Sequence, residues 1–261
     1  MTQLKNYFYR SVKSPVNLAV YLVLPAIIIA LNIMIMNNNM EGDLHIVNGN
    51  NLMASGIVIQ ILVMFQMFGT SLVYDLLYQD FRSDMRWRLL AAPKSLNSYL
   101  RANLISAFIL NMVIGTVLVT VGHFAFSAYL FNIPMLIATM AVTSAFTMAV
   151  GTIIFLVTEK KSAAEGLAHA MVWPQFIPLM MGLANEGIME TIFTRATPAA
   201  LAMNAIYFSA SPIETRVAIP MIGSAITDVD MTRAFTDLGI LAGVTVVVWI
   251  VAAIIGKTKK F

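Results

Sequence analysis

Long apolar runs follow one another along this chain and are separated by shorter polar stretches. A transmembrane helix needs about 20 mostly apolar residues, because it must cross about 30 Å of hydrocarbon. The pattern therefore predicts an all-α membrane protein with six transmembrane helices and both termini on the same side of the membrane. The six predicted spans are Leu18–Met36, Leu52–Leu77, Leu100–Val121, Ile133–Val157, Ala163–Ala184 and Leu238–Gly256.

Two segments outside the spans suggest further short helices. Residues 1–14 place apolar side chains at three- and four-residue spacing between basic ones, which predicts a helix in the cytoplasmic interface. A basic flank that only sets the topology would share this pattern. Residues 185–237 form a long outer loop, in which Thr197 and Pro198 are typical of a helix N-cap and first residue. We expect a short apolar helix there, at residues 199–208, which lies in the outer interface or dips back into the protein.

Residues 78–92 carry an apolar stripe, formed by Phe81, Met85 and Leu89, among acidic and basic side chains. Apolar residues four positions apart share one face of a helix, and Pro93 would end that helix. The segment therefore predicts a charged amphipathic helix on the cytoplasmic side. A loop that only sets the topology would need only Lys and Arg, so the mixture of Asp and Arg favours a docking surface for a cytoplasmic partner.

The distribution of Lys and Arg indicates the orientation, because both are enriched in cytoplasmic loops. Of the 16 basic residues, 13 fall in the two tails and in the loops after the second and fourth spans. The opposite loops contain most of the acidic residues. We therefore expect a multi-pass protein of the cell (cytoplasmic) membrane with both termini in the cytoplasm.

Composition narrows the classes of function. The chain is 59% hydrophobic and 11% charged, whereas soluble domains are about 45–50% apolar and about 25% charged. This composition excludes a soluble enzyme and a disordered chain. Because the formal net charge is only +3, we also expect no nucleic acid partner. Cysteine is absent and the three histidines show no ligand spacing, so we expect no metal site. Nucleotide-binding, zinc-protease and serine-hydrolase motifs are also absent, so we expect no enzyme activity and no catalytic residue in this chain.

Over nearly its whole length the chain resembles the permease subunits of the type-2 ABC transporter family, as a single transmembrane permease domain at residues 1–261. The resemblance includes the order of interfacial helix, spans, charged helix and outer segment. Its most specific part is the pattern R-E-x-G-T-x-x-x-L-L-x-x-P-x-S of the family's coupling helix, which docks on the ATPase subunit. The residues that fit this pattern are Arg82, Leu89, Leu90, Pro93 and Ser95, whereas Asp84 and Met85 replace its Gly and Thr. The resemblance makes these residues candidates for ATPase coupling: Asp80, Arg82, Asp84, Arg86, Arg88, Leu89 and Pro93.

The resemblance implies an exporter in which this permease pairs with a second copy or a sister permease within the lipid bilayer. A separate ATP-binding cassette subunit would bind ATP and Mg²⁺, so no cofactor is expected in this chain. In the family, the second and fifth spans face each other across the dimer axis and line the pathway. The lining candidates lie at three- and four-residue spacing on those spans: Gln60, Met64, Met67, Ser71, Glu165, His169, Phe176 and Met180.

The lining candidates are polar near the inner mouth and rich in Met and aromatic residues further out. Such a path would suit a drug-like, peptide or lipid-like amphiphile, because Met is flexible and polarisable. The same stripes are also typical of helix packing. An alternative function is a secondary transporter or channel, driven by an ion gradient, that uses Asp75, Glu165 or His169 for ion coupling. The sequence lacks the internal repeats that such transporters often contain.

Overall fold

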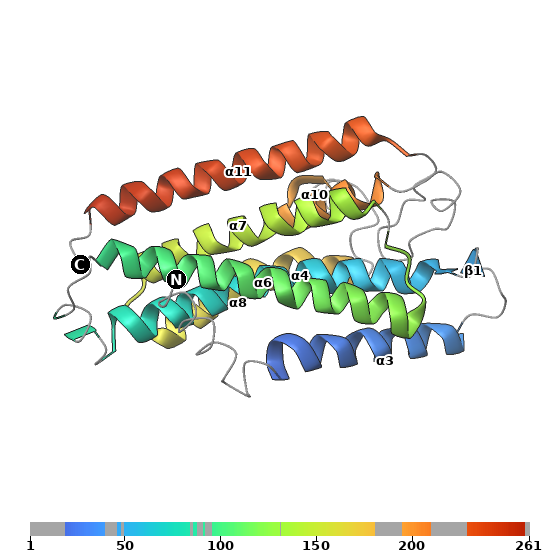
Figure 1. Cartoon of the computed structure of the whole chain (residues 1–261), viewed down its shortest axis with the longest axis horizontal. Coiled ribbons are helices and arrows are strands. Elements are labelled where there is room, and N and C mark those ends of the chain that lie inside the picture. The colour runs from blue at the N-terminus through green and yellow to red at the C-terminus, as the bar shows by residue number, and fades with distance from the viewer. Residues whose placement is uncertain are drawn as a thin grey trace.

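The computed structural model describes residues 19–39, 46–47, 50–83, 86–87, 91, 96–130, 132–180, 195–209 and 229–258. Within these ranges most residues are helical, and the long helices lie side by side in an elongated bundle (Figure 1). The elements are η1 (Ala19–Val23), α3 (Leu24–Asn39), β1 (Ile46–Val47), β2 (Asn50–Asn51), α4 (Leu52–Phe81), α6 (Leu96–Phe126), α7 (Ile133–Val157), α8 (Lys161–Met180), α10 (Pro198–Tyr207) and α11 (Met231–Thr258). The two strands pair antiparallel. The predicted helix at residues 1–14 lies outside the described residues.

Four helices of the described chain are long and apolar enough to cross a membrane: Ala54–Phe81, Ser98–Phe126, Ile133–Val157 and Met231–Thr258. They correspond to the second, third, fourth and sixth predicted spans, and they make the chain an all-α, multi-pass membrane protein. The first predicted span forms η1 and α3, whose apolar stretch Ala19–Ile35 is shorter. The fifth forms α8, which begins with Lys161. All six predicted runs thus overlap helices, and a six-span topology stays a prediction.

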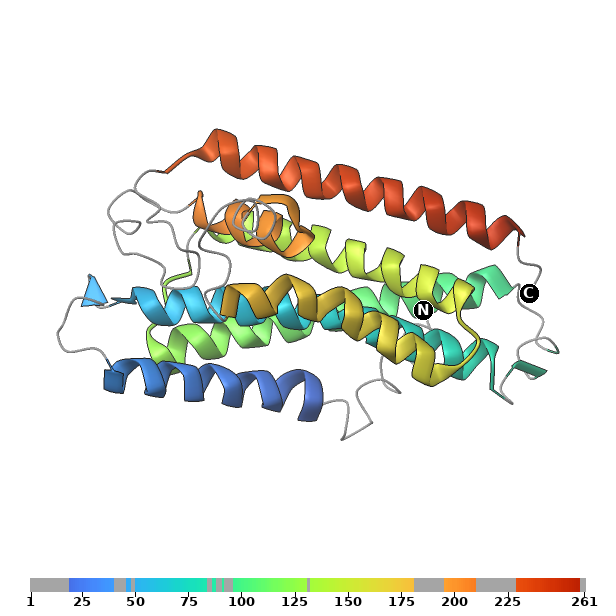
Figure 2. The same cartoon turned by 180° about the vertical axis from the view of Figure 1, so that it is seen from behind.

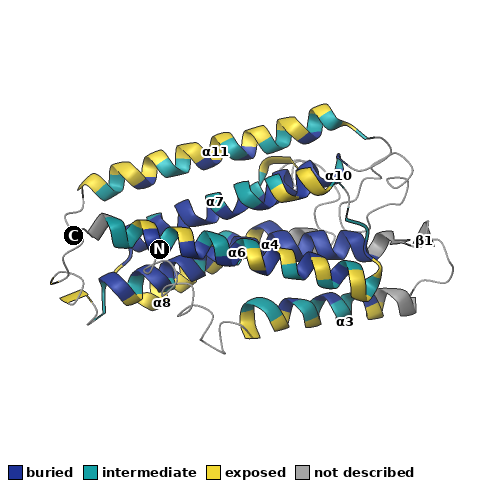
Figure 3. Cartoon of the chain, viewed as in Figure 1, coloured by how far each residue is buried: buried dark blue, intermediate teal, exposed yellow. Residues whose placement is uncertain are grey.

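α4 is the central helix of the bundle. Its sequence is apolar on all sides, and a helix of that kind is stable only where other protein or lipid surrounds it. α3, α6, α7, α8 and α10 all contact it. α6 lies in front of α4 in Figure 1 and α8 lies in front of it from behind (Figure 2), so these two helices cover opposite sides. α11 packs at the edge, on α7 and α10, and leaves most of its apolar surface exposed (Figure 3).

Close contact between α4 and its neighbours depends on a small residue and a polar one. A Cβ added at Gly151 of α7 would lie 2.8 Å from the backbone oxygen of Thr70 in α4, so only glycine permits this approach. Asn111 of α6 donates through Nδ2 to the Gln66 backbone oxygen and to Ser144 Oγ, at 3.2 Å each. Small residues and interhelical hydrogen bonds are what hold membrane helices together, because lipid tails are as apolar as Leu.

The helices alternate in direction, so α4, α7 and α11 end where α6 and α8 begin (Figure 1). The Arg82 guanidinium reaches the Thr158 carbonyl beyond α7, and a Cβ added at Gly256 of α11 would lie 3.8 Å from Leu156 of α7. The two loops in which the sequence concentrates basic residues therefore lie at one end of the bundle, together with Lys257 in the last turn of α11. The predicted grouping is confirmed for the described basic residues, and the side of the membrane that they face stays a prediction.

The short helix expected in the outer loop is present as α10. Thr197 is its N-cap, since Thr197 Oγ1 accepts from the Ala200 backbone N–H at 3.1 Å, and Pro198 follows at the first helical position. Residues 199–207 are all buried, and α10 packs against α4, α7, α8 and α11. Of the two predicted locations, the structure therefore favours the one inside the protein. Residues 210–228 of the same loop lie outside the described residues.

The second predicted span ends later than the sequence suggested. α4 continues without a break to Phe81, so residues 78–81 are its last turn and not the start of a separate charged helix. Aromatic contacts explain the difference: the ring of Tyr78 lies 5.7 Å from that of Tyr74, and the ring of Phe81 lies 6.2 Å from that of Phe155 in α7. The contact with Phe155 holds the turn against α7. Beyond Ser83, the structure describes only residues 86–87 and 91 of the predicted helix.

Candidate functional site

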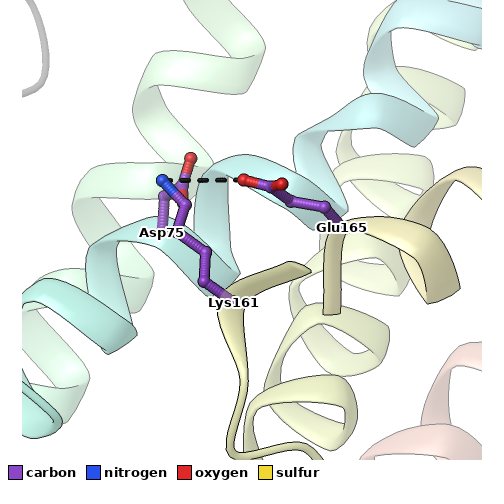
Figure 4. Close-up of polar contacts among 3 residues, drawn as sticks. All are labelled: Asp75, Lys161 and Glu165. Carbon is purple, nitrogen blue, oxygen red and sulfur yellow. Dashed lines mark ion pairs between the residues drawn. The ribbon is translucent and has the colours of Figure 1, made fainter. Parts of the chain in front are cut away.

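Three charged side chains meet where α4 approaches its end and α8 begins. Lys161 Nζ lies 3.1 Å from Asp75 Oδ1 and 3.6 Å from Glu165 Oε1 (Figure 4). Lys161 and Glu165 are one turn apart on α8, whereas Asp75 belongs to α4, so the lysine joins two helices. The Asp75 side chain is 29% exposed, and the other two are 49% exposed. We call these three residues the charge cluster.

The charge cluster contains one ammonium group and two carboxylates. The hydrogen bond to Asp75 raises the pKa of Lys161 above its ordinary value, so the lysine stays charged at every physiological pH. Tyr21 of η1 lies within electrostatic range of both carboxylates. The cluster therefore links α8 to α4 by an ion pair at the end of the bundle that carries the basic loops.

Aromatic contacts continue the junction of α4 and α8 along the two helices. The Phe68 ring of α4 meets the His169 ring edge-on, with centroids 5.6 Å apart, and meets the Trp173 ring in the same way at 5.6 Å. His169 and Trp173 are exposed and Phe68 is half-buried. Edge-to-face pairs of this kind contribute about 0.5–1.5 kcal/mol beyond the area they bury.

α8 uses a narrow stripe to pack on the bundle and leaves the rest of its surface uncovered. The buried residues of the stripe are Ala164, Ala168, Val172, Gln175 and Phe176. The exposed residues, which we call the open face of α8, are Lys161, Ser162, Ala163, Glu165, Gly166, Leu167, His169, Ala170, Trp173 and Pro174. A charged side chain costs about 2.5–3.5 kcal/mol at the centre of the bilayer. The polar part of the open face is therefore suited to water, headgroups or another protein, and not to lipid tails.

The predicted lining residues occupy two different environments. Gln60, Met64 and Met67 of α4, and Phe176 of α8, are buried within the single chain. Ser71 is half-buried on α4, Glu165 and His169 lie on the open face of α8, and the side chain of Met180 is not described. Of these residues, Ser71 and His169 each lie one helical turn from a residue of the charge cluster, and Glu165 belongs to it. A lining role for the buried four would require neighbouring helices to separate, and it stays a prediction.

Two of the predicted coupling residues are engaged inside the chain. Asp80 is buried and accepts a hydrogen bond from Asn103 Nδ2 of α6 at 2.7 Å. Arg82 donates to the backbone oxygens of Phe155, at 2.7 Å, and Thr158, and its guanidinium lies 4.8 Å from the centre of the Phe155 ring. The last carbonyl groups of a helix have no partner within it and attract positive charge. Arg82 therefore caps α7.

One other coupling candidate, Arg86, lies among the described residues and faces outward, as does its neighbour Trp87. Arg86 is exposed, and Trp87 is 72% exposed. The Ala91 backbone N–H donates to the Trp87 backbone oxygen at 3.1 Å, which is the spacing of an α-helical turn. Asp84, Arg88, Leu89 and Pro93 lie outside the described residues.

Sequence reasoning found Glu165, His169 and Asp75 but missed their partners. Lys161 was read only as a determinant of orientation, although its position one turn before Glu165 was a signal that the two would pair. Phe68 and Trp173 were missed because aromatic residues in an apolar run have no distinctive pattern. Among the described residues, no three His, Asp or Glu side chains are grouped so that they could hold a metal ion.

Taken together, the apolar helices, the buried central helix and the polar junction at one end define a multi-pass, α-helical membrane protein. Comparison with protein-family models, curated proteins and solved structures finds no match to this chain.

Proposed function

We propose that this chain is the transmembrane subunit of an ATP-driven exporter of the ABC type. Two copies, or one copy and a sister permease, would form the translocation pathway, and a separate cytoplasmic subunit would bind ATP and Mg²⁺ and hydrolyse the nucleotide. The observation that carries the proposal is the open face of α8, on which Glu165 and His169 are uncovered.

A second permease subunit would explain the open face. Ionisable side chains within or near a membrane almost always face protein or a water-filled cavity. A facing subunit would enclose Ser71, Glu165, His169 and Trp173 in a shared space that is polar at the basic end and aromatic further in. That combination suits an amphiphilic cargo, such as a drug-like molecule, a peptide or a lipid-like compound, with a polar group and an apolar body.

The segment after α4 would receive the ATPase subunit. It contains an exposed arginine, Arg86, next to the exposed indole of Trp87. Trp and Arg are the residues that most often carry the energy of a protein interface. Movement of this segment would reach the bundle through Arg82, which ties the end of α4 to the end of α7.

The first test is whether an ATPase accompanies the purified protein. The full chain is isolated from its native membrane, and the preparation is assayed for Mg²⁺-dependent ATP hydrolysis and for a subunit that photo-crosslinks to azido-ATP. We expect both, with Arg86→Glu reducing hydrolysis several-fold. Arg101→Glu is the matched control, because Arg101 is exposed at the same end of the bundle on α6 and lies outside the proposed docking segment. Absence of an ATP-binding subunit, or equal effects of the two charge reversals, would contradict the proposal.

The ion-gradient alternative also has a specific observation in its favour. Asp75, Lys161 and Glu165 form a network of titratable groups at the junction of two helices, and such networks serve proton relays in pumps and transporters. Transport by this mechanism would collapse with the proton gradient and survive depletion of ATP. The exporter proposed above predicts the opposite result in the same vesicles.

A further inference from the structure

Lys161 is shared between two carboxylates that belong to different helices. Its Nζ lies 3.1 Å from Asp75 on α4 and 3.6 Å from Glu165 on its own helix. In Figure 4 the ammonium group lies beside the Asp75 carboxylate, a dashed line runs from it toward Glu165, and the two acidic side chains come from different ribbons. The shorter contact therefore crosses between helices, and the longer one moves with α8.

We propose that the charge cluster is a latch with a reserve partner. The pair between Asp75 and Lys161 holds the end of α4 against the start of α8. When the two helices separate, Lys161 stays paired with Glu165, one turn away on the same helix. This goes beyond the proposed transport function, because it concerns an opening motion within one chain and requires neither an ATPase nor a cargo.

The reserve partner matters because of the cost of unpaired charge. When the two helices part, each charge of the pair loses the attraction of its partner, a modest cost for side chains that are 29% and 49% exposed. A lysine at the start of α8 with no second carboxylate would carry that cost each time the helices parted. Glu165 removes this cost for Lys161, since residues four apart on one helix can stay paired throughout the motion. The remaining cost falls on Asp75 alone.

The contacts around the cluster are compatible with such an opening. Ala164 and Ala168 are the residues through which this part of α8 packs on the bundle, and both are small and fully buried. The next contact along the helices is the edge-on pair of Phe68 and His169. On the α8 side, separation at the latch therefore uncovers two alanines.

The latch makes an unusual prediction about two acidic residues that share one lysine. Asp75→Asn removes the pair that closes the latch, so the open state becomes more populated. Glu165→Gln removes the carboxylate that pairs with Lys161 in the open state. The closed state keeps the pair with Asp75, so it becomes more populated. Both substitutions change the local charge by the same amount, so a general electrostatic effect would act in the same direction in both variants.

Opening can be measured with a single introduced cysteine, because the chain contains none. Ala164→Cys places a thiol in the buried stripe, and Ser162→Cys places one on the open face as a matched control. The purified full chain, in phosphatidylcholine vesicles, is treated with an uncharged, water-soluble maleimide. The rate at position 164 is divided by the rate at position 162.

Relative to the parent chain, we expect this ratio to rise in Asp75→Asn and to fall in Glu165→Gln, each by about two- to fivefold, the range for a half-exposed ion pair. In the double variant, the effect of Glu165→Gln should disappear, because Lys161 then has no partner on α4 in either state. The same direction of change in both single variants, or an unchanged ratio in Glu165→Gln, would overturn the latch. Since Glu165 is exposed, that variant folds independently of the α4 core and decides the question even if Asp75→Asn does not fold.

Discussion

Arg82 offers the sharpest test of how the end of α4 is held. Its guanidinium donates to the backbone oxygens of Phe155 and Thr158 and lies over the Phe155 ring. A hydrogen bond that involves a charged group contributes about 1.5–3 kcal/mol, and a cation over an aromatic ring about 0.5–1 kcal/mol where water has access. These contributions overlap and Arg82 is only half-buried. We therefore expect Arg82→Ala to lower the free energy of unfolding by about 2–4 kcal/mol.

The assay is thermal unfolding of the purified chain in a mild detergent, followed by circular dichroism. A loss of 1 kcal/mol corresponds to about 2–4 °C for a chain of this size, so the midpoint should fall by about 4–16 °C. The unfolding midpoint of Arg82→Lys should lie between those of Arg82→Ala and the parent chain, because lysine keeps the charge but cannot bond two carbonyls with one planar group.

Arg101→Ala is the control, since Arg101 is exposed and substitutions at such positions change stability by less than about 0.5 kcal/mol. Should Arg82→Ala and Arg101→Ala unfold at the same temperature, Arg82 does not cap α7. The expected instability also explains why Arg86, and not Arg82, is the residue to reverse in a test of ATPase docking: loss of Arg82 would disturb the bundle itself.

Two further predictions concern helix packing. Gly151→Ala should lower the free energy of unfolding by about 1–3 kcal/mol, because its Cβ would meet the Thr70 backbone oxygen at 2.8 Å. Gly239→Ala is the control and should be neutral or slightly stabilising, since no atom lies within 4 Å of the added Cβ. Equal unfolding midpoints in the two variants would refute the close approach of α7 to α4. Asn111→Leu should cost about 0.6–2 kcal/mol through its lost bonds to α4 and α7, and an unchanged unfolding temperature would show that these bonds carry no net stability.

The sequence predicted the helices well because their determinants are local. An apolar run of about 20 residues is recognisable without knowing its neighbours, and each of the six predicted runs overlaps a helix. The start of α10 was predicted to the residue, since Thr197 Oγ1 and Pro198 act on the backbone of their own first turn. The grouping of the basic loops followed for a similar reason: alternating helices return the chain to the same end.

The candidate site was predicted only in part. Spacing placed Glu165, His169 and Phe176 on one face of a helix, but only Glu165 and His169 are uncovered and Phe176 is buried. Spacing gave no information about which neighbour would approach, so the pairing of Lys161 with Asp75 and the contact of Phe68 with His169 did not follow. The charge of Asp80 suggested an exposed docking residue, but its carboxylate is buried and accepts a hydrogen bond from Asn103 of α6.

The sequence of this protein determined that it is helical, that it belongs in a membrane and which of its ends is basic. Each of these depends on the free energy of transferring a segment, or its charge, between water and lipid, and a segment carries that free energy wherever its neighbours lie. The tertiary structure decided that α4 is central, that Arg82 caps α7 and that the lysine of the charge cluster has one partner on each of two helices. Those features depend on distances between residues far apart in the chain, which only packing sets.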